Sequence, residues 1–116
     1  MRSHRTERAA EQLRLELARL IESEVRDPRV GFATVTEVRL ASDMRSARVL
    51  VNVLGDEEQE RSTMKGLVAA ANFLRHELSE ALSLRHTPEL SFEIDKGQEN
   101  SQRVEELLKR IKPKKE

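Results

Sequence analysis

Two arginine–histidine pairs, Arg75-His76 and Arg85-His86, carry the side chains best suited to bind a ligand. A guanidinium group can donate two parallel N–H groups to the oxygens of one phosphate. The pairs stand near the two ends of an apolar-striped stretch that follows Asn72, and a helix start there would add backbone N–H groups for the same anion. The sequence therefore predicts a phosphate-binding surface formed by Asn72, Arg75, His76, Arg85 and His86.

Two further arginines extend this candidate RNA-binding site. Arg45 and Arg48 stand at the turn between two predicted strands and in the second of these strands. A different use of the cations is equally compatible with the sequence, because Arg75 and Arg85 have carboxylates nearby in the chain, namely Glu77, Glu80 and Glu89. Exposed ion pairs of this kind contribute little to stability. The sequence leaves both uses of the arginines open.

Residues for catalysis or metal binding are scarce. The sequence has no cysteine, so it offers no thiolate nucleophile, no cysteine metal site and no disulfide. The histidines His4, His76 and His86 are not at metal-ligand spacing, and neither a His-Glu-x-x-His motif nor a nucleotide-binding glycine loop is present. We therefore predict no enzymatic activity, no cofactor and no metal site.

Charge and composition limit how the chain can bind a nucleic acid. Its 21 basic and 21 acidic side chains give zero net charge, so attraction to a polyanion requires the cations to gather on one surface. Aromatic residues make up only 3%, which leaves few rings for stacking bases. We expect recognition of RNA backbone and shape. The sequence shows neither a secretion signal nor an apolar run of membrane-spanning length, and it predicts a cytoplasmic protein.

The hydrophobic pattern predicts the order of helices and strands in a chain of one-domain size. Apolar residues at three- and four-residue spacing predict a helix over 10–25, a long or broken helix over 57–84, and a short helix from Asn100 or Ser101 to Ile111. Alternating apolar and polar residues predict strands over 34–40, 47–53 and 90–94. Pro88 requires the long helix to end near Arg85 and an extended segment to follow.

This order predicts a two-layer α+β fold in which helices pack on one face of a three-stranded mixed sheet. The first two strands form an antiparallel hairpin, and the helical crossover returns the third strand to the sheet. We expect the first strand, 34–40, to be central. Asn72 tolerates positive φ and would permit a kink at residues 70–72, although an uninterrupted helix fits the spacing equally well.

Several short motifs occur in an order and spacing that are known from one protein family. They are Asp27-Pro28-Arg29, Ala70-Ala71-Asn72-Phe73-Leu74-Arg75, and Leu84-Arg85 followed by Pro88-Glu89-Leu90 and Phe92. Together they resemble ribosome-binding factor A over nearly the whole chain. The resemblance implies a single KH-like domain of type II over residues 1–111, with the order α-β-β-α(kinked)-α-β-α, and a short basic tail over 112–116. In that family an Ala-x-Gly kink replaces the glycine loop of ordinary KH domains, and here Asn72 stands in place of the glycine.

The resemblance also implies a function, namely a non-catalytic assembly factor of the small ribosomal subunit. It would bind free immature 30S subunits through 16S rRNA and assist late maturation and 16S rRNA processing. It would act as a cytoplasmic monomer, with other assembly factors as further candidate partners. The alternative is a protein–protein interaction module with a KH-like fold, which the neutral net charge supports.

Overall fold

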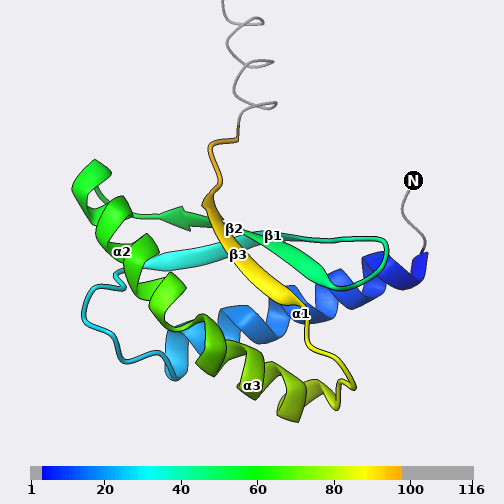
Figure 1. The fold of residues 1–116 in the computed structure, drawn as a ribbon. Coiled ribbons are helices and arrows are strands. Elements are labelled where there is room, and N and C mark those ends of the chain that lie inside the picture. Colours follow the sequence, from blue (N-terminus) through cyan, green and yellow to red (C-terminus); the bar gives the residue numbers. More distant parts are fainter. Residues whose placement is uncertain (1–3, 98–116) are drawn as a thin grey trace, which may run out of the picture.

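The structure is a computed structural model that describes residues 4–97, whereas residues 1–3 and 98–116 lie outside the described part. The elements follow the order α1 (His4–Ser23), β1 (Ala33–Leu40), β2 (Ser46–Val53), α2 (Glu57–Ala69), α3 (Ala71–Leu82) and β3 (Glu89–Ile94). Figure 1 shows the helices gathered on one side of the sheet, which confirms the α+β prediction. The predicted helix ending at residue 111 and the tail over 112–116 fall outside the described residues, so the proposed domain limits stay a prediction.

Helix α1 forms because one of its sides is continuously apolar. Ala10, Leu13, Leu17, Leu20 and Ile21 are buried at three- and four-residue spacing. The helix begins six residues before the predicted start, since the buried Thr6 continues the same side. It ends at Ser23, where the N–H groups of Glu24 and Val25 both donate to the carbonyl oxygen of Leu20 at 2.7 and 3.1 Å.

Strand β2 is the centre of the sheet, so the prediction that the first strand is central was wrong. β2 pairs antiparallel with β1 and parallel with β3. Its apolar residues explain this position, because Val49, Leu50 and Val51 are all buried although they are consecutive and therefore alternate between the two faces. The unbroken apolar run was the sequence signal for a strand that has neighbours on both edges.

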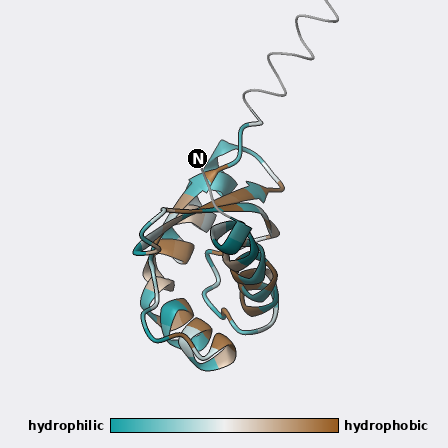
Figure 2. Ribbon diagram, turned by 90° about the vertical axis from the view of Figure 1, so that its right-hand side faces the viewer, coloured by the Kyte–Doolittle hydropathy of each residue, from teal (hydrophilic) through white to brown (hydrophobic). Residues whose placement is uncertain are grey.

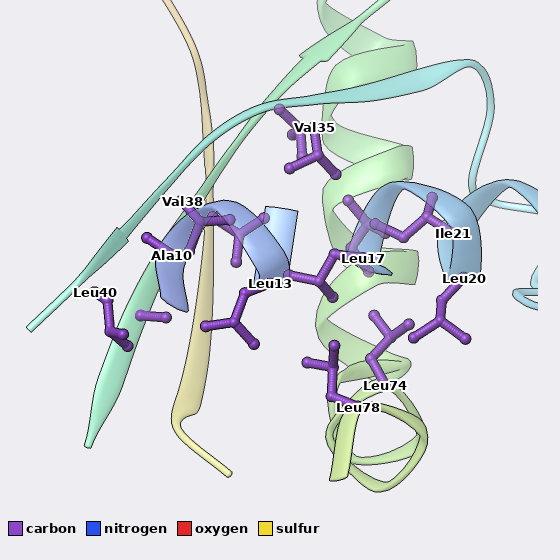
Figure 3. Close-up of a cluster of buried hydrophobic side chains, with 14 of the residues drawn as sticks. Ala10, Leu13, Leu17, Leu20, Ile21, Val35, Val38, Leu40, Leu74 and Leu78 are labelled. Carbon is purple, nitrogen blue, oxygen red and sulfur yellow. The ribbon is translucent and has the colours of Figure 1, made fainter. Parts of the chain in front are cut away.

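The hydrophobic core lies between the sheet and the helices. Figure 3 shows the leucines of α1 between Val35 and Val38 of β1 and Leu74 and Leu78 of α3. In Figure 2 the apolar segments of the ribbon face the space between the layers and hydrophilic ones lie largely outside. Partly buried Phe92 packs against this cluster from β3. The core therefore fixes the position of α3 relative to β3.

The start of α2 is stabilised by a reciprocal capping interaction. A side-chain oxygen of Asp56 accepts the backbone N–H of Gln59 at 2.9 Å, and the side chain of Gln59 accepts the backbone N–H of Asp56 at 2.8 Å. Glu57, Glu58 and Glu60 lie in the first turn, where negative charge is favourable beside the positive end of the helix dipole. The structure supports the structural interpretation of this acidic cluster.

The loop between α1 and β1 is held against α2. The carboxylate of Asp27 accepts hydrogen bonds from the backbone and side chain of Arg29 at 2.6–3.0 Å, and these bonds lower the pKa of Asp27 to about 2. The hydroxyl of Thr63 accepts the N–H of Gly31 at 3.1 Å. A Cβ atom on Gly66 of α2 would lie only 2.5 Å from a methyl group of Val30, so glycine permits the close approach.

Replacing Asp56 by alanine should lower the free energy of unfolding by about 1 kcal/mol, because the cap of α2 is lost. The matched control is Asp56→Asn, which keeps a side-chain oxygen for the same N–H group and should change stability much less. Urea denaturation followed by circular dichroism measures both variants. Equal losses in the two variants would contradict the role of the cap.

Candidate nucleic-acid interface

The chain bends between α2 and α3, and the bend is made by Ala70. Its φ and ψ are −89° and 1°, its N–H donates to the carbonyl oxygens of Gly66 and Leu67 at 3.0 Å, and α3 starts at the next residue. The break between helices is therefore present. Asn72 does not take the left-handed conformation that the sequence left open, because Ala70 provides the bend in a conformation that any residue can adopt. Asn72 lies exposed in the first turn of α3 instead.

Helix α3 ends at Leu82, slightly before the predicted boundary. Ser83 takes the left-handed conformation with φ 52° and ψ 46°, and its N–H donates to the carbonyl oxygen of Ser79. The N–H of Leu84 donates to the same oxygen at 3.2 Å. The chain then passes through Arg85 and His86 to Pro88, which is buried at the start of β3. This turn brings residues 85–87 back alongside α3.

Arg75 fastens that turn to α3. Its Nε donates to the carbonyl oxygen of Pro88 at 3.0 Å, and its Nη2 donates to that of Thr87 at 2.9 Å. The partners are backbone carbonyls, so the alternative in which Arg75 holds Glu77, Glu80 or Glu89 is not what the structure shows. Two of the five guanidinium N–H groups are used in this way, and the half-buried side chain positions its neighbours.

Five of the seven predicted RNA-binding residues line one hollow of about 360 Å³ on the surface of α3. Asn72, Arg75 and His76 come from α3, while Arg85 and His86 come from the turn after it. No aspartate or glutamate lines this hollow. Among the described residues, none makes a hydrogen bond or ion pair to the side chains of His76, Arg85 or His86. We call this site the α3 hollow.

Arg45 and Arg48 lie outside the α3 hollow, and the structure gives them different environments. The carbonyl oxygen of Arg45 accepts the N–H of Glu89 at 2.9 Å, so Arg45 borders the turn that Arg75 holds, and its guanidinium has no partner within residues 4–97. Arg48 instead donates two hydrogen bonds to the carboxylate of Glu93 at 2.7 and 2.8 Å. That contact lowers the pKa of Glu93 and occupies Arg48.

Two residues of the α3 hollow were missed by the sequence analysis. Ser79 lies three residues beyond His76 and seven beyond Asn72 on the same side of α3, so its spacing was a usable signal. Thr87 lines the hollow because its carbonyl oxygen accepts a hydrogen bond from Arg75. No local sequence pattern reveals this long-range contact. Within residues 4–97 no cluster of three potential metal ligands occurs, and no helix is long and apolar enough to cross a membrane.

Fold and surface together define a class, a small α+β protein with a broken helix pair and a basic hollow beside the break. Comparison with known proteins gives the family. The family model for ribosome-binding factor A matches residues 5–108, and the chain belongs to that family.

Solved structures agree with this assignment. A crystal structure of ribosome-binding factor A from Thermus thermophilus is 28% identical, with a TM-score of 0.69 over 77% of this chain and 93% of that one. The protein in a solution structure from Thermotoga maritima is 32% identical in sequence to this chain, with a TM-score of 0.72. The match covers 81% of this chain and 90% of that one. A homology model of Thermus thermophilus ribosome-binding factor A, fitted into a cryo-EM map of its complex with 30S, is 31% identical in sequence to this chain, with a TM-score of 0.61. The match covers 72% of this chain and 88% of that one.

Arg75 and Arg85 should differ in their effect on stability. Arg75→Ala removes two charge-assisted hydrogen bonds and should lower the free energy of unfolding by roughly 1.5–3 kcal/mol. Arg85→Ala, at an exposed position without a partner in the described structure, should change it by less than about 0.5 kcal/mol. Chemical denaturation of the two variants tests this difference, and equal stabilities would contradict the positioning role of Arg75.

Proposed function

We propose that this protein is an assembly factor that binds the free immature 30S ribosomal subunit through 16S rRNA in the cytoplasm. Membership of the ribosome-binding factor A family supports the ribosomal target, and a 30S complex is described for the related Thermus thermophilus protein. The broken α2–α3 pair beside a three-stranded sheet agrees with a KH-like scaffold in which the helix break replaces the glycine loop. The protein acts as a monomer.

The observation that carries this proposal is the α3 hollow, which brings together Arg75 and Arg85, two arginines with no carboxylate partner within residues 4–97, on a chain of zero net charge. Long-range attraction cannot come from the whole molecule, so it has to come from such a surface. The exposed Arg85 guanidinium can fork onto phosphate oxygens, and His76, His86 and Asn72 supply further hydrogen-bond donors. No phenylalanine, tyrosine or tryptophan lines the hollow, and His76 and His86 offer only small rings for stacking, so the site binds backbone and shape more than bases.

The role in maturation follows from preferential binding to one RNA conformer. A factor that binds the immature arrangement more tightly than the mature one shifts the population toward the first and leaves when the second forms. This differential affinity assists late maturation and 16S rRNA processing without chemical catalysis. Arg45, at the margin of the turn, extends the cationic surface toward the hairpin. Arg48, paired with Glu93, contributes less.

A salt titration with free 30S subunits tests the site. For wild-type protein, log affinity should fall linearly with log salt concentration. Arg85→Ala should weaken binding and reduce the magnitude of that slope by about 0.7–0.9, the value for one lost phosphate contact. The matched control is Arg8→Ala, which removes the same charge from an exposed position of α1 whose side chain has no partner within residues 4–97. Equal effects of the two variants would remove the α3 hollow from the proposal.

The same measurements separate the proposal from a protein–protein interaction module. A salt-independent affinity would favour the module, because apolar contacts release no counterions. Sedimentation gives the target: the protein should move with free 30S subunits and stay at the top of the gradient with assembled ribosomes. Binding to both species alike would contradict a role confined to maturation.

Purified protein should not cleave RNA. The α3 hollow has no carboxylate to act as a base or to hold a divalent ion. Incubation of precursor 16S rRNA with the protein and Mg²⁺, followed by gel electrophoresis, should leave the RNA intact. Metal-dependent turnover that survives repurification and disappears in Arg85→Ala would instead establish a nuclease.

A further inference from the structure

Two hollows of about 550 and 160 Å³ lie where helix α1 meets strand β1. The larger is lined by residues 18–25 and 30–35, and the smaller by residues 7–14 and 36–38. Within residues 4–97 the strand order is β1-β2-β3, so β1 forms one edge of the sheet. The α3 hollow borders the turn that leads into β3, at the other edge.

The two hollows form one groove because they follow the same side of α1. The α1 residues that line them are three or four positions apart, which places their side chains on one side of a helix. They include Glu7, Glu11, Arg14, Ala18 and Glu22. Helix and strand run in opposite directions, and Figure 3 shows Ala10 near Val38 and Ile21 toward the Val35 end of β1. We call the two hollows together the α1–β1 groove.

The larger hollow is mainly apolar. Ile21, Val25 and Val30 line it together with Phe32, which is 80% exposed. Exposed apolar surface beside a hollow is typical of sites that bind another protein, where phenylalanine is enriched. At its margin lies Glu22, which is exposed and has no ion pair or hydrogen bond partner for its carboxylate within the described residues.

The smaller hollow is negatively charged. Three carboxylates line it, those of Glu7, Glu11 and Glu37. Of the side chains that line it in the described part of the chain, Arg14 is the only cation. Arg14 pairs with Glu11 and Arg39 pairs with Glu37, but both pairs lie at the surface, where ion pairs contribute little and a new partner can replace them. Glu7 lies 4.0 Å from Nδ1 of the exposed His4.

These charges decide which class of partner fits the groove. Carboxylates repel phosphate, so the groove does not suit RNA, whereas no carboxylate of the described residues lines the α3 hollow. An apolar hollow followed by carboxylates is complementary to a polypeptide with apolar side chains followed by lysine or arginine. From Glu7 to Glu22 helix α1 spans about 22 Å, and about seven extended residues cover this length.

We propose that the α1–β1 groove binds an extended basic segment of a second protein. Its apolar side chains occupy the larger hollow and cover Phe32, and its cations replace Arg14 and Arg39 as partners of Glu11 and Glu37. Basic arms of this kind are common in proteins that bind nucleic acid. RNA in the α3 hollow and protein in the α1–β1 groove lie at opposite edges of the sheet, so both can be bound at once.

A peptide titration with the free full-length protein, followed by amide NMR shifts, tests the groove. The probe is a peptide of sequence LVVSKKR with blocked ends, and the control peptide is LVVSEEE. The basic peptide should give saturable shifts in residues 7–22 and 30–38 but not in 72–79, and the acidic peptide should give none. Glu7→Lys with Glu37→Lys should weaken binding at least tenfold. Glu57→Lys with Glu58→Lys, the same change of charge on α2, should not. No shifts in the groove, or equal effects of the two variants, would overturn the proposal.

The apolar end is tested by Phe32→Ser in the same titration. Phe32 is exposed, so the variant should keep the circular dichroism spectrum of the natural protein, while its affinity for the basic peptide should fall at least fivefold. The matched control is Leu15→Ser, which removes a 57% exposed leucine of α1 that lines neither hollow. An unchanged affinity in Phe32→Ser would overturn the proposal.

Photo-crosslinking with purified 30S subunits tests the partner in the complex, and this step rests on the proposed function. Phe32→benzoylphenylalanine should attach to a lysine- and arginine-rich segment of a ribosomal protein, identified by mass spectrometry. His86→benzoylphenylalanine should attach to 16S rRNA. RNA attached at both positions would overturn the protein partner and leave the α3 hollow in place. A chain that does not bind the subunit would contradict the proposed function alone, because the peptide titration decides the groove independently.

Discussion

The bridge from Arg75 to the carbonyl oxygens of Thr87 and Pro88 is the interaction on which the candidate site depends. These residues are separated by the end of α3, a left-handed Ser83 and an irregular turn, so local sequence alone does not bring them together. Fixing such a turn has an entropy cost of about 1–2 kcal/mol per residue, which a charge-assisted pair of hydrogen bonds helps to offset. Without the bridge, Arg85 and His86 would lie in a free loop.

The structure shows how a chain of zero net charge can present a cationic surface. Many arginines are neutralised locally by a carboxylate: Arg14 by Glu11, Arg19 by Glu16, Arg29 by Asp27, and Arg48 by Glu93. Three carboxylates without such partners, Glu57, Glu58 and Glu60, lie together at the start of α2, where the helix dipole favours them. The side chains that line the α3 hollow include two arginines and no carboxylate. Segregation of charge, and not its sum, therefore determines the electrostatic character of this surface.

Sequence periodicity predicted the described elements well because each helix and strand buries one side. The predicted central strand was wrong. The antiparallel hairpin makes β1 and β2 neighbours, but it does not determine which of the two pairs with β3. The consecutive buried residues Val49, Leu50 and Val51 carried that information. The break between α2 and α3 was recognised as an option, yet its geometry came from Ala70 and not from Asn72, because bend conformations near ψ 0° require no special residue.

Five of the predicted site residues lie together for a physical reason. Asn72 and His76 share one side of a helix, and Pro88 forces a chain reversal that returns Arg85 and His86 to that side. These consequences follow from local geometry. The different environments of Arg75 and Arg85 do not follow from local geometry. Both are arginines near carboxylates in the sequence, and only the tertiary structure decides which of them donates to backbone carbonyls. One arginine is immobilised to shape the surface, and the other stays free to bind. In the proposed function, a surface ordered in this way before binding would lose less conformational entropy on contact with RNA.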